Sequence, residues 1–131
     1  MTTKYTNEAH RQYLDLLAHV GQRWLAIFEG DTAFYSAHYW DLLTTLWEYP
    51  GPMRKTDALA AMKTVRSAHT AGKYLDAAIS AGILVETGNP KDARSRLVTL
   101  SDDMRAKIDA MFDDAVDELC ASASRIERMK S

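Results

Sequence analysis

The sequence predicts a mostly α-helical fold with a small β-wing, that is, one two-stranded hairpin. Apolar residues recur at spacings of three and four over most of the 131 residues, which is the period of an amphipathic helix. Two β-prone runs, at residues 83–86 and 95–100, flank a turn-rich loop at residues 87–94. With 47% hydrophobic residues the chain can form one core, so we expect a single domain over residues 1–131.

Two helices are expected before residue 50. From Glu8 to Phe28 one apolar stripe comprises Tyr13, Leu16, Leu17, Val20, Trp24, Ile27 and Phe28. A second apolar side means that this helix needs more than one neighbour. Gly30 and Asp31 follow its end. The second helix is expected from about Ala37 to Tyr49, with Ser36 as its N-cap and a Pro-Gly-Pro sequence closing it.

A helix-turn-helix is expected next. Its first helix runs from Asp57 to about Lys63, and residues 64–66 form the turn. Ser67 caps the second helix, which stops at Gly82. The apolar stripe of the second helix comprises Ala68, Ala71, Leu75, Ala78 and Ile79. Its opposite, polar face carries Arg66, His69, Thr70, Lys73 and Asp76.

The hairpin leads into a long last helix. Ser101 is a capping hydroxyl, and Asp102 and Asp103 follow it at the positive end of the helix dipole. One apolar stripe then comprises Met104, Ile108, Met111, Phe112, Ala115, Leu119, Ala123 and Ile126. A helix of about 28 residues spans about 40 Å, more than a small domain can cover alone. We therefore expect a second copy of the chain to cover it, together with the first helix.

Positive charge is concentrated around the helix-turn-helix and the hairpin. The net charge of the chain is −2, but residues 54–96 hold eight Lys or Arg and four Asp or Glu. That segment is therefore positive, whereas the remainder is negative. A local basic field beside a helix and a hairpin is typical of DNA binding. The alternative interpretation is a chance excess of charge on a solvated face.

The order of these elements and two sequence segments resemble one family. The segment TAGKYLDAAISAGILVE at residues 70–86 is similar to a recognition helix that ends in Gly and passes directly into a wing strand. Residues 89–94 contain Asp-x-Arg at the wing tip, and Leu-Val-Thr-Leu-Ser at 97–101 begins the last helix. This pattern resembles the MarR family of bacterial winged-helix transcription regulators, over essentially the whole chain.

The resemblance implies a winged helix-turn-helix homodimer on double-stranded DNA. Residues 8–35 and 101–131 would form the dimerisation helices, and residues 36–100 the DNA-binding lobe. The recognition helices would occupy successive major grooves, while the wing arginine, oriented by the wing Asp, would enter a minor groove. The candidate DNA-binding residues are Arg66, Ser67, His69, Thr70, Lys73, Lys91, Asp92, Arg94 and Arg96. Alternatively, Arg94 and Arg96 are ordinary solvated residues, and Lys73 and His69 pair with Asp76 along the helix.

Aromatic residues crowd the first two helices, where such stripes are typical of a core or of dimer packing. In the resembling family, small aromatic effectors bind between the dimerisation helices and the DNA-binding lobe. The candidate ligand-binding residues for such an effector are Trp24, Phe28, Tyr39 and Trp47.

The sequence predicts no enzyme. No phosphate loop, nucleophile elbow or dinucleotide fingerprint occurs, so we expect no catalytic residue and no cofactor. The four histidines lack metal-ligand spacing, so no metal site is expected. Cys120 is expected on or beside the buried stripe of the last helix, as a small hydrophobic residue. The sequence contains neither a membrane span nor a signal peptide, which predicts a cytoplasmic location.

These observations predict a sequence-specific, DNA-binding transcriptional regulator. We expect it to be a repressor, with repression relieved by a small aromatic effector. The alternative is a winged-helix protein-interaction adaptor without specific DNA binding.

Overall fold

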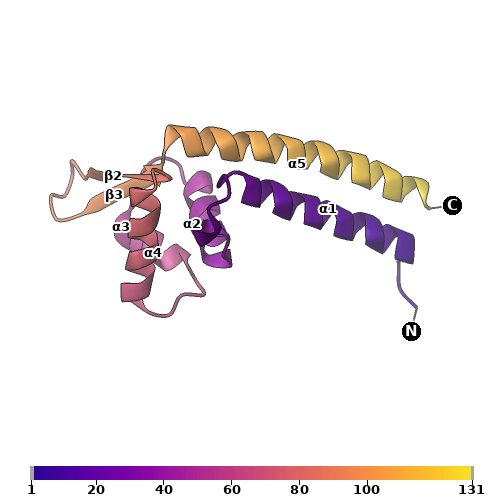
Figure 1. Cartoon of the computed structure of the whole chain (residues 1–131), viewed down its shortest axis with the longest axis horizontal. Helices are drawn as coiled ribbons and strands as arrows, with labels where there is room; N and C mark the ends of the chain where they lie inside the picture. Colours follow the sequence, from indigo (N-terminus) through magenta and orange to yellow (C-terminus); the bar gives the residue numbers. More distant parts are fainter. Residues whose placement is uncertain (1, 131) are drawn as a thin grey trace. The chain divides into compact units, whose positions relative to one another are not determined.

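The computed structural model describes residues 2–130 and has the predicted fold class (Figure 1). The elements in chain order are α1 (Asn7–Ala26), η1 (Thr32–Phe34), α2 (Ala37–Glu48), β1 (Met53–Arg54), α3 (Lys55–Ala61), α4 (Ala68–Ser80), β2 (Leu84–Gly88), β3 (Arg96–Leu100) and α5 (Asp102–Arg128). The chain forms two compact units. The terminal unit comprises the chain up to Gly30 and from Lys107 onward, and the central unit comprises Asp31–Ala106.

The central unit is organised around a three-stranded antiparallel sheet in the order β1-β3-β2. Val98 at the middle of β3 pairs with Met53 on one side and with Glu86 on the other, and it has no exposed surface. Helices α2 and α3 contact β3, while α4 contacts β2. The most deeply buried large side chains that pack against the sheet are apolar: Leu42, Leu43 and Leu46 of α2, Leu75 of α4 and Met62 directly after α3. Burial of this kind is the main force that holds the helices to the sheet.

Helix α4 ends in a Schellman motif, as its terminal glycine predicts. The Ile83 N–H donates to the Ala78 carbonyl at 3.0 Å, and the Gly82 N–H donates to the Ile79 carbonyl at 3.1 Å. This pattern requires a left-handed residue at the turn, and Gly82 has a φ of +78°. The motif satisfies two helix carbonyls and turns the chain at once into β2. Gly82 therefore sets the direction in which β2 leaves α4.

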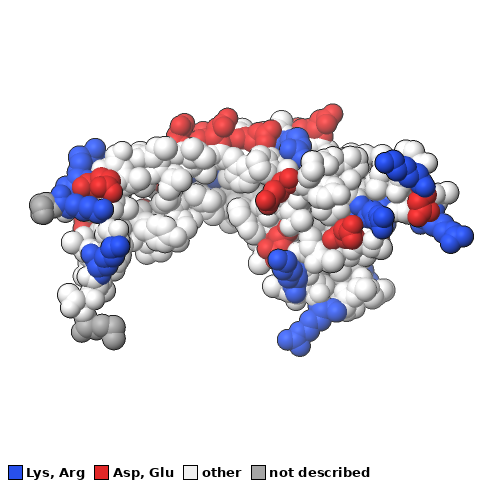
Figure 2. All heavy atoms as spheres, turned by 180° about the vertical axis from the view of Figure 1, so that it is seen from behind, with Lys and Arg blue, Asp and Glu red and all other residues white. Residues whose placement is uncertain are grey.

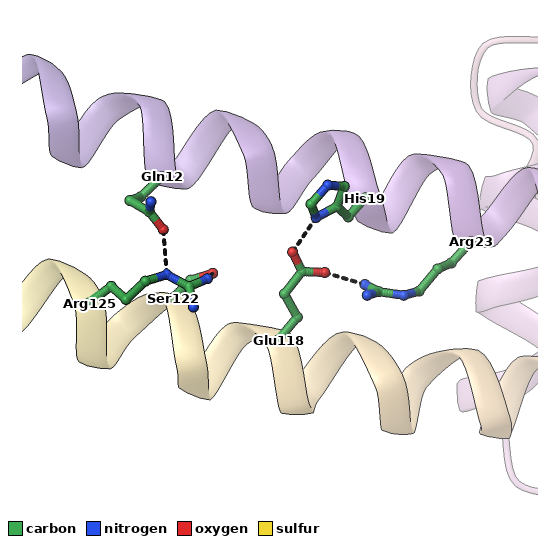
Figure 3. A network of polar contacts seen from close by, with 6 residues as sticks. All are labelled: Gln12, His19, Arg23, Glu118, Ser122 and Arg125. Atoms are coloured by element: carbon green, nitrogen blue, oxygen red, sulfur yellow. Dashed lines mark hydrogen bonds and ion pairs between the residues drawn. The ribbon is translucent and has the colours of Figure 1, made fainter.

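The terminal unit consists of α1 and most of α5, which lie side by side (Figure 1). Polar contacts join the two helices (Figure 3). Glu118 accepts hydrogen bonds from His19 and from Arg23, the latter at 2.5 Å. The hydrogen bond from His19, with Arg23 as the second donor, lowers the pKa of Glu118. A second contact runs from Arg125 Nε to Gln12 Oε1 at 2.7 Å.

Large apolar side chains remain exposed on both helices of the terminal unit. Tyr13, Leu14 and Leu17 of α1 are 57%, 64% and 49% exposed. On α5, Val116 is 56% exposed and Leu119 is 51% exposed. The first and last helices therefore carry apolar surface that a single chain does not cover.

Two details of the helices differ from the sequence predictions. Helix α3 starts at Lys55 rather than Asp57, because it follows directly after the short strand β1, which carries no periodic signal. Cys120 was expected on or beside a buried stripe, but it is exposed. The buried position in this part of α5 is Ser122, about 200° around the helix from Cys120 at 100° per residue.

Among the described residues, no helix is both long and apolar enough to cross a membrane.

The N-caps largely agree with prediction. Ser67 Oγ accepts from the Thr70 N–H at 3.4 Å, and Ser101 Oγ accepts from the Met104 N–H at 3.1 Å. Ser36 precedes α2 as expected, but its hydroxyl lies 2.9 Å from the His38 ring instead of capping the helix.

We expect alanine at two glycines to have opposite effects on stability. A Cβ added at Gly72 or at Gly82 would meet nothing within 4 Å, so only the backbone distinguishes the two positions. Gly72→Ala, inside α4, should raise the free energy of unfolding by about 1 kcal/mol. Gly82→Ala should lower it by about 1–2 kcal/mol, because a left-handed conformation is unfavourable for an L-residue. Urea unfolding measures both, and a Gly82→Ala variant as stable as the parent would contradict the helix-ending role of Gly82.

Candidate nucleic-acid interface

Helix α4 separates an apolar face from a polar one. Ala71, Leu75 and Ala78 are buried against the central unit. The opposite face exposes His69 and Lys73, and Arg66 is exposed just before the helix. Of the remaining predicted residues on this helix, Thr70 is half-buried and Ser67 uses its hydroxyl as the N-cap. The exposed groups lie on the first half of α4, the part that reads base edges in helix-turn-helix proteins.

The wing tip is folded by its own polar groups. Asn89 Oδ1 accepts from the Lys91 N–H at 3.0 Å, and Asp92 Oδ1 accepts from the Arg94 N–H at 3.0 Å. Asp92 therefore fixes the backbone of Arg94, and the contact is not with its guanidinium. Lys91, Asp92 and Arg94 are all exposed. A rigid tip with a projecting arginine is suited to a narrow, negatively charged groove.

Lys55 connects three elements of the central unit. Its Nζ lies 2.9 Å from Glu86 Oε1 on β2 and 3.4 Å from Asp76 Oδ1 on α4. Arg96 on β3 shares the same Glu86 oxygen at 3.6 Å. The hydrogen bond between Lys55 and Glu86 raises the pKa of Lys55 and lowers the pKa of Glu86. Both groups are consequently held in their charged forms around neutral pH.

This ion cluster was not found from the sequence. Lys55, Asp76, Glu86 and Arg96 lie on four different elements, and no local spacing connects them. The cluster also distinguishes Arg96 from Arg94, although both are predicted DNA-binding residues, because Arg96 has a carboxylate partner, Glu86, within the wing. The predicted alternative in which Asp76 pairs with His69 or Lys73 is not what the structure shows, since Asp76 pairs with Lys55.

The four aromatic ligand candidates lie in different units. Trp24 and Phe28, in the terminal unit, pack edge to face with ring centroids 5.2 Å apart. Tyr39, in the central unit, is 2% exposed and donates to the Tyr74 carbonyl at 2.8 Å. Burial raises the pKa of Tyr39 to about 12. Trp47, also in the central unit, is half-buried. These are core contacts of each unit, and an effector-binding role stays a prediction.

Acidic side chains gather on the last helix. Figure 2 shows a row of Asp and Glu along the upper edge of the molecule, which α5 occupies. The exposed acidic residues of α5 are Asp102, Asp103, Asp109, Asp113, Asp114, Asp117 and Glu127. Helix α5 carries eight Asp or Glu against four Lys or Arg, whereas the basic excess belongs to residues 54–96.

No family model matches the chain, and no curated protein matches it either. Several solved structures do. BpsR of Bordetella bronchiseptica, solved to explain how 6-hydroxynicotinic acid regulates its DNA binding, is 25% identical, with a TM-score of 0.50. That match covers 85% of this chain and 83% of BpsR. A probable transcriptional regulator from Pseudomonas aeruginosa is 23% identical over 83% of this chain and 80% of its own, with a TM-score of 0.52.

Another match is Sco3205, a MarR-family transcriptional regulator from Streptomyces coelicolor solved in complex with DNA. It is 18% identical, and the match covers 93% of this chain and 77% of Sco3205 with a TM-score of 0.54. BpsR and Sco3205 bind DNA, and the Pseudomonas aeruginosa protein is a probable transcriptional regulator. The matches confirm the resemblance that the sequence motifs predict. The chain has the winged-helix fold of the MarR-family transcriptional regulators, which it resembles over most of its length.

Proposed function

We propose that the protein is a sequence-specific, DNA-binding transcriptional regulator that acts as a repressor. The observation that carries the proposal is the arrangement of the central unit: a helix with an exposed polar face is joined through Gly82 to a hairpin whose tip projects Arg94. The likeness to BpsR, whose DNA binding is the subject of its structure, supports this function.

The two DNA-reading elements have different chemistry. Lys73 on α4 can donate to guanine O6 and N7 in a major groove, or hold a phosphate. The Arg94 guanidinium can enter a minor groove, where it senses groove width and A·T content. Because both elements are attached to one sheet, their separation is fixed when they meet DNA. This rigidity supports a specific regulator over an adaptor without specific DNA binding.

We expect Arg94→Ala and Lys73→Ala to weaken DNA binding in different ways. Arg94→Ala should cost about 1–3 kcal/mol of specific binding, most severely on operators with A·T-rich flanks. If Lys73 reads a base, its loss relaxes preference at one position per half-site. If it holds a phosphate, affinity falls on every sequence and the salt slope falls by about one per chain. Fluorescence anisotropy with duplexes from the region upstream of the gene, at two salt concentrations, measures these effects.

The control is Arg11→Ala, which removes one exposed cation from the terminal unit, where Arg11 pairs with Glu8. This variant should bind like the parent. If Arg94→Ala and Lys73→Ala also bind like the parent at both salt concentrations, α4 and the wing do not read DNA, and the adaptor function becomes the better proposal.

We also propose that the active form is a homodimer assembled through the terminal unit. Its support is the exposed apolar surface of α1 and α5. Light scattering should give close to twice the 14.7 kDa chain mass. Leu14→Lys combined with Leu119→Lys should give a monomer, because each adds a charge where apolar surface would be buried. Val85→Lys, at an apolar residue of the central unit that is 43% exposed, is the control and should stay dimeric. A parent chain that is monomeric at micromolar concentration would contradict the dimer.

Regulation by a small aromatic effector is the third part of the proposal. It is supported by the aromatic residues of α1 and α2 and by the likeness to BpsR, whose DNA binding 6-hydroxynicotinic acid regulates. Salicylate or 6-hydroxynicotinate should quench tryptophan fluorescence saturably and weaken DNA binding, because a ligand that prefers the non-binding conformation shifts the population. An aliphatic acid of equal charge is the control. If neither aromatic acid changes fluorescence or affinity, we would assign the aromatic residues to the core alone.

A further inference from the structure

A basic cleft lies between the start of α3 and the wing. Its volume is about 370 Å³, and four cations line it: Arg54 of β1, Lys55 of α3, Arg94 of the wing tip and Arg96 of β3. The only carboxylate in this lining is that of Asp92. The two wing arginines are among the DNA-binding residues that the sequence predicts, and Arg54 is not. The cleft therefore adds Arg54 to the DNA-binding surface that the sequence predicts.

The four cations of the cleft are not equivalent. Glu86 holds both Lys55 and Arg96, at 2.9 Å and 3.6 Å. Within residues 2–130, neither Arg54 nor Arg94 forms an ion pair. The two guanidinium groups without a carboxylate partner thus both line the cleft. An anion that enters it meets them without displacing an existing contact.

Strand β1 fixes the position of Arg54 relative to the wing. Arg54 pairs with Leu97 in the antiparallel register of β1 and β3. Its neighbour Met53 is 5% exposed, and because successive residues of a strand point to opposite faces, Arg54 is on the outer side. The strand that presents Arg54 is therefore hydrogen-bonded to the strand that continues from the wing tip. The sheet therefore places Arg54 on the strand beside β3, which begins two residues after Arg94.

We propose that this cleft binds a phosphate group and that the DNA backbone supplies it, with Arg54 as the contacting residue. The inference rests on the proposed function, because Arg94 is placed in a minor groove there. That groove is only about 6 Å wide, so phosphates flank an arginine inserted into it. Guanidinium groups bind phosphate oxygens in pairs of parallel hydrogen bonds, which suits an arginine on the wall of such a cleft. Lys55 and Arg96 are positioning residues that Glu86 holds in place.

The test is the salt dependence of DNA affinity for Arg54 variants of the full chain. Arg54→Ala should reduce affinity by the same factor on operator and unrelated duplexes, and the slope of log K against log salt should fall by about one per chain. Arg54→Lys should keep the slope, because it keeps the charge. Arg11→Ala is the matched control and should match the parent. Thermal unfolding of each variant verifies that the exposed side chain at residue 54 is not needed for folding.

The outcomes separate this inference from the proposed function. If Arg54→Ala matches the parent in affinity and slope while Arg94→Ala and Lys73→Ala lose binding, the cleft does not hold phosphate and the regulator function stands. If the parent binds no duplex, the proposed function is wrong, and a titration with inorganic phosphate, followed by the NMR signal of the Arg54 Nε–H, decides the cleft. A saturable shift that Glu86→Gln retains would then support a phosphate site of another source, and no shift would overturn the proposal.

Discussion

The pairing of β3 with its hairpin partner β2 and with β1, from a distant part of the chain, is the interaction on which the DNA-facing surface depends. Strand β1 precedes the helix-turn-helix and β2 follows it, and both are hydrogen-bonded to β3. Fully burying an aliphatic side chain such as that of Val98 contributes about 1.5–3 kcal/mol. Several such residues hold the sheet against α2, α3 and α4. The recognition helix, the wing and Arg54 are consequently attached to one rigid base.

The ion cluster around Lys55 acts on this base in a different way. Partly exposed ion pairs contribute only about 0–1 kcal/mol each, so the apolar core and the sheet determine the fold. The cluster instead determines which cations are available to a ligand. Glu86 engages Lys55 and Arg96 and leaves Arg54 and Arg94 free to contact a phosphate. The distribution of partners, more than the number of positive charges, defines the candidate site.

Locally encoded features could be predicted from the sequence, and contacts between distant residues could not. Apolar periodicity, the capping serines 67 and 101 and the terminal Gly82 are signals within a few residues, and the structure confirms the helices and strands that they predict. Strand β1 has two residues after a proline, and only its pairing with β3 makes it a strand. For the same reason Arg54 could not be recognised as part of a site. An apolar stripe predicts burial less well near the end of a long helix. Cys120 is exposed there, and the buried residue in this part of α5 is Ser122.

Charge cancellation around the cleft bears on specificity. The field at a phosphate is set mainly by charges within a Debye length of about 8 Å, so the overall charge of −2 does not prevent binding at a basic cleft. Non-specific affinity rises with each phosphate that a cation neutralises, whatever the sequence. By holding two of the four cations, Glu86 limits this non-specific contribution. The base contacts proposed for α4 do not involve these cations, so they would make up a larger share of the total binding energy. An acidic residue inside a basic surface thereby increases the ratio of specific to non-specific binding.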